Sequence, residues 1–212
     1  MRLYVDDFCI SPYALYAYVG LKEKGLPFEA VPVALQNKEQ RTHAYMELSL
    51  TGKVPCLEDG TFTVTESPAI VDYLEQAYPF PNHPRLLPAW PKERARALQI
   101  FSWLNSDFAA LRDERSTATM FYEKASKPLG AAAERDAERL FAFARRFVPQ
   151  DGGPLFGTWT IADTVLGFML NRLVQNGDPV PEPLRAYALA QWQRPSVQEF
   201  VKTKRAPYVP YY

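Results

Sequence analysis

The chain has 212 residues, with 24 basic and 24 acidic side chains, 47% hydrophobic residues and two cysteines. This length and composition are typical of a globular protein with one or two small domains. The balanced charge gives no electrostatic footprint for nucleic acid, and no apolar run approaches the roughly 20 residues of a membrane span. Two cysteines do not form a disulfide framework and the start shows no signal-peptide pattern, so we expect a reduced, cytoplasmic protein.

The first part of the chain alternates between strand and helix patterns. Leu3–Val5 is a short apolar strand, and Ser11-Pro12 then begins a helix, because serine is a favoured N-cap and proline suits the first helical position. Residues 28–33 alternate like a strand, and residues 37–48 indicate a short polar helix. The order that follows from these patterns is βαβ and then αββα.

The stretch from Gly52 to Ile70 is the most informative part of the sequence. It contains two short apolar strands joined by Asp59-Gly60, a strong hairpin signal because both residues tolerate positive φ. Pro55 lacks an N–H and therefore suits the start of the first strand. If its peptide bond is cis, the backbone N–H and C=O of Val54 face outward and are free to pair with an extended ligand.

The helix expected at Ser67-Pro68 begins in the same way as the one at Ser11-Pro12. Its N-terminus and hydroxyl are suited to a carboxylate, and the adjacent Glu66 is suited to an ammonium group. A carboxylate and an ammonium on one carbon describe the head of an amino acid. This end of the helix is therefore a candidate amino-acid binding site.

The second part of the chain is expected to be helical. Residues 78–91 contain five prolines and read as an interdomain linker. After it, helical periodicity predicts helices over 91–114, 131–147, 161–174, 183–192 and 195–204, and the tail 206–212 is expected to lie across the surface without forming a helix.

Two further features belong to this helical part. Thr160 and Asp163 have the spacing of a capping box and predict the start of a buried helix, with a role in folding. A set of aromatic residues is suited to a hydrophobic pocket, although residues at helical spacing are more often core: Phe101, Trp103, Phe108, Phe121 and Tyr122.

Taken in order, four motifs resemble the cytosolic glutathione transferase family: Ser11-Pro12, Val54-Pro55, Glu66-Ser67 and Thr160 to Asp163. The resemblance implies a thioredoxin-like α/β N-terminal domain that binds glutathione (1–78), a linker (79–91) and an all-α C-terminal domain with the hydrophobic substrate pocket (92–212). It is closest in kind to serine-type bacterial, zeta/theta-like members. In that family the residue before the cis-proline, here Val54, pairs with the cysteinyl part of glutathione, and the Glu-Ser pair, here Glu66 and Ser67, holds the γ-glutamyl head.

The resemblance also implies a function. Glutathione would be activated as a thiolate for conjugation to, or peroxide reduction of, a hydrophobic electrophilic small molecule, with glutathione as co-substrate and no metal. A homodimer is expected, with no nucleic-acid or membrane partner. The alternatives are a non-catalytic binding protein, a thioltransferase and a glutathione-dependent isomerase of a maleyl-type diacid. The consecutive serines and cysteine that zeta-like isomerases carry at the helix start are absent here.

Three residues compete for the catalytic role. Ser11 is the first choice, because a hydroxyl at a helix N-terminus can donate a hydrogen bond to the glutathione sulfur; the plain alternative is a simple N-cap. Cys9 would be the working thiol of a thioltransferase, and Tyr4 stands in the strand where tyrosine-type enzymes keep their tyrosine. By resemblance, Lys53 meets the glycine carboxylate of glutathione, and Gln40 is a weaker candidate for the same contact.

Overall fold

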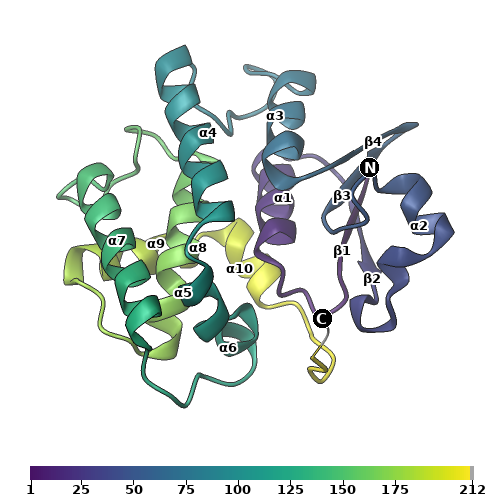
Figure 1. Cartoon of the computed structure of the whole chain (residues 1–212). Helices are drawn as coiled ribbons and strands as arrows, with labels where there is room; N and C mark the ends of the chain where they lie inside the picture. The colour runs from purple at the N-terminus through teal and green to yellow at the C-terminus, as the bar shows by residue number, and fades with distance from the viewer. Residues whose placement is uncertain (211–212) are drawn as a thin grey trace. The chain divides into compact units, whose positions relative to one another are not determined.

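The computed structural model describes residues 1–210, and its element order is shown in Figure 1. The chain divides into two compact units. The first consists of Met1–Leu86 together with the segment from Glu199 onward, and the second consists of Leu87–Gln198. No helix of the described residues is long and apolar enough to cross a membrane. Each unit is described by itself below.

The first unit contains a four-stranded sheet in the order β2-β1-β3-β4. Its strands are β1 (Arg2–Asp6), β2 (Glu29–Val33), β3 (Cys56–Asp59) and β4 (Phe62–Thr65). β1 pairs in parallel with β2, whereas β3 is antiparallel to both β1 and β4. This mixed sheet with its βαβ and ββα order confirms the thioredoxin-like fold that we expected from the sequence.

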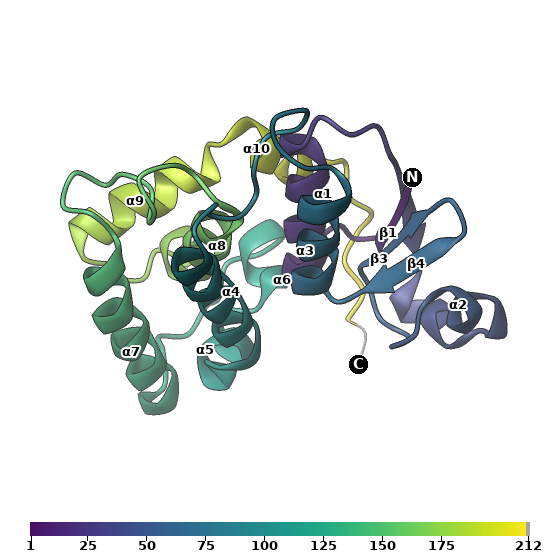
Figure 2. The ribbon, with the colours of Figure 1, turned by 90° about the horizontal axis from the view of Figure 1, so that it is seen from above.

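Helices cover both faces of the sheet, as Figure 2 shows. Helices α1 (Pro12–Glu23) and α3 (Ser67–Ala77) lie on one face, and α2 (His43–Leu48) lies on the other. Successive side chains of each strand therefore pack either against α1 and α3 or against α2. Tyr4 and Cys56 pack with Tyr45 of α2, while Leu3 and Leu57, their neighbours along the strands, are fully buried as well.

Two local details of this unit differ from the sequence prediction. Residues 37–48 do not form one helix: two 3₁₀ turns, Leu35–Asn37 and Glu39–Arg41, precede α2, because Lys38 adopts a left-handed conformation (φ 58°) between them. In the hairpin, Asp59 still pairs with Phe62, so the two-residue loop is Gly60-Thr61 rather than Asp59-Gly60. Gly60 provides the positive φ (62°) that such a tight loop needs.

The helical unit contains α4 (Pro91–Ser106), α5 (Ala109–Glu114), α6 (Thr117–Phe121), α7 (Ala131–Phe147), α8 (Ile161–Asn176) and α9 (Glu182–Trp192). Helix α10 (Pro195–Val201) spans the division between the two units. The sequence prediction had ended it at Lys204. The predicted helix 131–147 is confirmed as α7, and the short α6 was not expected from the sequence.

The prediction of a single long helix over 91–114 is wrong, because the helix is interrupted at Asp107-Phe108. The Asp107 carboxylate accepts hydrogen bonds from the Phe108 backbone N–H (2.7 Å) and from the Trp103 indole (2.8 Å). Phe108 is left-handed (φ 63°) and fully buried. A short acidic side chain that bonds to the backbone competes with helical hydrogen bonding, and here it separates α4 from α5.

Helix α8 is the centre of the helical unit, since every residue from Ile161 to Leu173 is buried. The predicted capping box at its start is confirmed: the Asp163 carboxylate accepts from the Thr160 backbone N–H (2.8 Å) and hydroxyl (3.0 Å). It also accepts from the Leu155 N–H (2.8 Å) and the Tyr187 hydroxyl (2.9 Å). Asp163 therefore joins α8 to the preceding loop and to α9.

Candidate functional site

The strand register brings the sequence motifs of the first unit to one end of the sheet. Cys56 pairs with Tyr4 on one side and with Thr65 on the other. Residues before Cys56 therefore lie beside the end of β1 and beside the residues that follow β4. The sheet thus brings together the loop with Ser11, the Val54-Pro55 step and the Glu66-Ser67 pair, which stand far apart in the sequence.

Ser11 is the N-cap of α1, as expected from the sequence. Its Oγ accepts a hydrogen bond from the Ala14 backbone N–H at 3.3 Å, and its own backbone N–H donates to Asp6 Oδ1 at 3.0 Å. An oxygen that accepts at the cap keeps its own proton for a second partner. The plain N-cap role and the role of a donor to a ligand are therefore compatible at Ser11.

The loop that leads to Ser11 is held by a buried carboxylate. Asp6, at the end of β1, is 0% exposed, and its second oxygen, Oδ2, accepts from the Ile10 backbone N–H at 2.8 Å. Burial raises the pKa of the Asp6 carboxyl, while the two backbone hydrogen bonds oppose that shift. Asp6 was not among the residues predicted from the sequence; its local signal is an acidic residue between a strand and a helix N-cap.

Cys9 differs from a typical reactive thiol in the direction of its pKa shift. Burial, followed by the nearby Asp6 charge, raises its pKa to about 11, whereas reactive cysteines have lowered pKa values. Its backbone is left-handed (φ 49°), which is uncommon for a residue other than glycine. Both cysteines of the described chain are free.

Tyr4 is directed to the α2 face of the sheet. It is 7% exposed, its ring packs against Tyr45, and its hydroxyl donates to Glu58 Oε2 at 2.8 Å. Burial, with the hydrogen bond to Glu58 as the next cause, raises the pKa of the phenol. The hydroxyl proton of Tyr4 is thus already used within the protein.

The Val54-Pro55 step directly before β3 has the backbone geometry that leaves Val54 free for an extended ligand. The Val54–Pro55 peptide bond is cis. Among residues 1–210, neither the N–H nor the C=O of Val54 makes a protein hydrogen bond. In contrast, Lys53 is tied down: its C=O accepts from the Tyr45 hydroxyl (2.9 Å) and from Ser49 Oγ (3.1 Å), while its side chain is exposed.

Helix α3 begins one residue earlier than the sequence predicted. Ser67 is its first helical residue, and the N-cap position is taken by Glu66, whose side chain makes no capping bond. Glu66 has φ 66° and an exposed side chain, whereas Ser67 is 1% exposed. A non-glycine residue in this conformation is uncommon, and such residues concentrate at functional sites.

The remaining polar candidates are separate from one another. Gln40 has a buried Oε1 atom without a hydrogen-bond partner in the described chain. His43 is exposed beside Glu47, and His83 Nδ1 lies 2.9 Å from the Lys24 carbonyl. Within residues 1–210, no three His, Cys, Asp or Glu side chains gather as metal ligands would.

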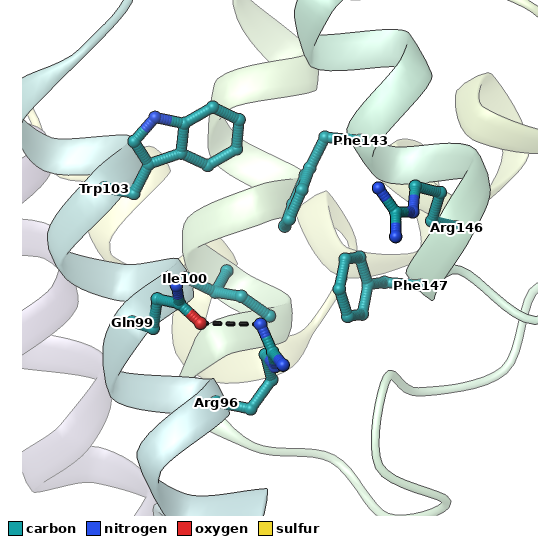
Figure 3. A pocket seen from close by; sticks show the side chains of 7 residues that line it. All are labelled: Arg96, Gln99, Ile100, Trp103, Phe143, Arg146 and Phe147. Carbon is teal, nitrogen blue, oxygen red and sulfur yellow. Dashed lines mark hydrogen bonds between the residues drawn. The ribbon is translucent and has the colours of Figure 1, made fainter.

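The helical unit carries an aromatic pocket of about 350 Å³ between α4 and α7, shown in Figure 3. The rings of Trp103, Phe143 and Phe147 form its wall. The centroid of the Phe143 ring lies 4.7 Å from that of Trp103 and 4.7 Å from that of Phe147. Arg96 and Arg146 lie at its edge, and no carboxylate lines it. Phe143 and Phe147 remain partly exposed in this pocket.

The other aromatic candidates have different places. Phe101 and Phe108 are fully buried core residues, as is more common for aromatic residues at helical spacing. Phe121 packs against Phe168 and Trp192. Of the five aromatics considered in the sequence, Trp103 is the one that lines the α4–α7 pocket.

Comparison with known proteins gives a consistent family assignment. The C-terminal domain of glutathione S-transferase matches residues 91–205, and the N-terminal domain matches residues 10–77. A crystal structure of a glutathione transferase homolog from Burkholderia gl BGR1 with bound glutathione is 42% identical, with a TM-score of 0.79 and coverage of 95% of this chain and 96% of that one.

Curated relatives match over shorter segments. Human glutathione S-transferase theta-2 is 31% identical over 103 residues, which are 49% of this chain and 41% of the relative. Maleylacetoacetate isomerase from Pseudomonas aeruginosa is 34% identical over 116 residues, which are 53% of this chain and 52% of the relative. The chain thus aligns with about half or less of these relatives' length. With both domains matched, the chain belongs to the glutathione S-transferase family.

Proposed function

We propose that this protein activates glutathione as a thiolate and transfers it to an electrophilic small molecule. The observation that carries the proposal is the strand register, which brings the Ser11 N-cap, the unbonded backbone of Val54 and the start of α3 at Ser67 to one end of the sheet. The proposal is supported by the family assignment and by the bound glutathione in the Burkholderia relative.

Each residue has a distinct proposed role. Glu66 and Ser67 hold the γ-glutamyl head, since the N-terminus of α3 favours a carboxylate and Glu66 is suited to the ammonium group. The free N–H and C=O of Val54 pair with the cysteinyl backbone. Lys53 binds the glycine carboxylate, with Gln40 as the second candidate because its buried amide oxygen lacks a partner.

Ser11 is the proposed activating residue. Its hydroxyl donates to the glutathione sulfur, and the positive N-terminal end of α1 adds a second favourable interaction with the thiolate. Lowering a thiol pKa from ~8.5 to ~6.5 needs about 2.7 kcal/mol of preference for the charged form. One hydrogen bond to a charged group contributes about 1.5–3 kcal/mol, so this donor and the helix end together are sufficient.

The test combines binding with turnover. The protein is passed over immobilised glutathione and then assayed with an aryl halide and with an organic hydroperoxide. Retention with turnover of either substrate supports the proposal. Retention without any turnover would instead indicate a non-catalytic binding protein, and absence of retention would contradict the assigned site.

A second candidate reaction is cis–trans isomerisation of a maleyl-type diacid, with glutathione as a catalytic cofactor. It is favoured by the 34% identity to the Pseudomonas aeruginosa isomerase. The same nucleophilic thiolate would add to the double bond and leave again after rotation. Conversion of a maleyl diacid only in the presence of glutathione, without consumption of glutathione, would support this reaction over conjugation.

We further propose that the protein is a homodimer whose interface covers the α4–α7 pocket. The pocket leaves aromatic rings partly exposed, and within residues 1–210 the Arg146 guanidinium has no protein partner. Analytical ultracentrifugation should show a dimer that Arg146→Glu weakens. Arg145→Glu changes the neighbouring arginine, which does not line the pocket, and serves as the matched control. A monomeric wild-type protein would contradict the proposal.

A further inference from the structure

The loop from Asp7 to Ile10 has a conformation that the loop residues do not stabilise by themselves. Cys9 is left-handed (φ 49°), and its backbone N–H bonds to the Asp6 carbonyl at 2.9 Å. A non-glycine residue with such a φ persists where the surrounding structure holds its backbone in place. Groups from outside the loop do so here. Gln36 Nε2 donates to Asp7 Oδ2 at 2.6 Å at the start of the loop, and two further groups hold the part that leads to Ser11.

The first group is the Asp6 carboxylate. Each of its oxygens accepts one backbone N–H from the end of the loop, Ile10 at 2.8 Å and Ser11 at 3.0 Å. It forms no ion pair with any described residue. Hydrogen bonds to a buried charged acceptor are strong and directional, so the carboxylate fixes where the loop ends and α1 begins.

The second group is the Arg205 guanidinium in the segment after α10. Its Nε and Nη2 atoms donate to the Cys9 carbonyl at 3.3 and 3.0 Å, across a separation of 196 residues. The guanidinium also donates to the carbonyls of Val201 (2.6 Å), Thr203 (2.8 Å) and Phe200 (3.0 Å). These bonds anchor the guanidinium to its own segment, so it holds the loop from a fixed point.

A ring contact supports the same attachment. The rings of Phe8 and Tyr208 meet edge to face with centroids 5.5 Å apart. The segment after α10 therefore contacts the loop through the backbone at Cys9 and through a side chain at Phe8. From the sequence we expect this segment only to lie across the surface, because nothing local connects Arg205 with Cys9.

We propose that Asp6 and Arg205 are positioning residues that together orient the Ser11 hydroxyl toward the glutathione sulfur. The proposal rests on the proposed function. The Ser11 backbone is bonded to Asp6 and its Oγ to Ala14, so the direction of the free hydroxyl proton follows the loop. A displacement of about 1 Å in an aligned site can cost a hundredfold in rate, so loss of either contact should affect catalysis.

The experiment compares Arg205→Gln with Arg185→Gln, which removes an exposed arginine of α9 that forms a 3.9 Å ion pair with Glu182. Three quantities are measured: the dissociation constant of glutathione, the pKa of its bound thiol from ultraviolet thiolate absorbance, and kcat with an aryl halide. Arg205→Gln should raise the thiol pKa by about one unit and lower kcat roughly tenfold, with affinity within about twofold. Arg205→Lys, which keeps the charge and a donor to the Cys9 carbonyl, should recover part of the loss.

Asp6→Asn should likewise raise the thiol pKa and lower kcat, because the amide of asparagine keeps only one of the two acceptor oxygens of the carboxylate. If that variant does not fold, Arg205→Gln still decides the question. A wild-type thiol pKa in Arg205→Gln would overturn the positioning role, as would an effect limited to stability or to glutathione affinity. If wild-type protein lowers the thiol pKa and Ser11→Ala abolishes this, the proposed function stands whatever Arg205→Gln does. A wild-type protein that leaves the thiol pKa unshifted overturns both.

Discussion

The hydroxyl of Tyr4 donates a hydrogen bond to Glu58 Oε2 at 2.8 Å, on the α2 face of the sheet. This bond uses the donor that a tyrosine-type enzyme would offer to the glutathione sulfur. The phenol is also buried, and its pKa is raised. The Tyr4 hydroxyl is thus already engaged within the protein, and variants of Ser11, Cys9 and Tyr4 decide which of the three contacts the glutathione sulfur.

Ser11→Ala should cut turnover roughly ten- to a hundredfold, because a hydrogen bond to a developing thiolate contributes about 1.5–3 kcal/mol. It should also raise the pKa of bound glutathione while affinity stays nearly unchanged. A pH titration of thiolate absorbance in the complex measures the pKa directly. Tyr4→Phe is the control, and a raised pKa in that variant with a normal one in Ser11→Ala would assign the role to tyrosine.

Cys9 should react slowly with iodoacetamide. With a pKa of about 11, its thiolate fraction at about pH 8 is far below that of a free thiol with a pKa of ~8.5. Allowing for the greater nucleophilicity of a more basic thiolate, the rate should be lower by roughly ten- to twentyfold. The measurement uses a Cys56→Ser background and the guanidinium-unfolded chain as reference. A rate that reaches its plateau near pH 8 would indicate a low-pKa thiol and would favour a thioltransferase.

Ser67→Ala should weaken glutathione binding without changing the thiol pKa of the glutathione that still binds. Leaving a buried charged carboxylate without this partner costs about 1–3 kcal/mol, so calorimetry should show a loss of roughly five- to a hundredfold in affinity. Ser116→Ala, at the N-cap position of α6, is the matched control in the helical unit. If Ser67→Ala kept its affinity and shifted the pKa, the roles assigned to Ser67 and Ser11 would be reversed.

Asp163→Ala should destabilise the fold by more than the ~0.5–2 kcal/mol of an ordinary N-cap. The carboxylate accepts from Leu155, Thr160 and Tyr187, and its removal leaves buried donors without partners, at about 1–3 kcal/mol for each. Tyr187→Phe removes a single donor and should cost about 0.5–1.5 kcal/mol. Urea titrations compare the variants, and equal losses for both would refute this explanation.

Asp107 should stabilise the protein at neutral pH and lose that effect in acid. The hydrogen bond from Arg139 is the main cause that lowers its pKa to about 2, below the ~3.9 of an unfolded chain. A lowered carboxyl pKa contributes stability above the unfolded value and loses it as pH falls through the folded value. The melting temperature of Asp107→Asn should lie below that of wild type at pH 7 and converge with it between about pH 4 and 2. Asp113→Asn, an exposed residue of α5, should follow wild type throughout.

The sequence by itself determined the features that depend on neighbouring residues. Ser11 and Thr160 start helices because of their own capping chemistry, and Gly60 provides the positive φ of the hairpin loop. Alternating apolar residues specified the short strands, and helical periodicity specified α7 and α8. These are preferences of neighbouring residues, so the amino-acid sequence alone is sufficient to predict them.

The tertiary structure decided what distant residues do to one another. The strand register, not any local signal, brings Ser11, Val54 and Ser67 to one end of the sheet. Arg205 reaches the Cys9 carbonyl from 196 residues away. Such contacts follow from packing and from the need to pair buried polar groups, and these depend on the whole fold.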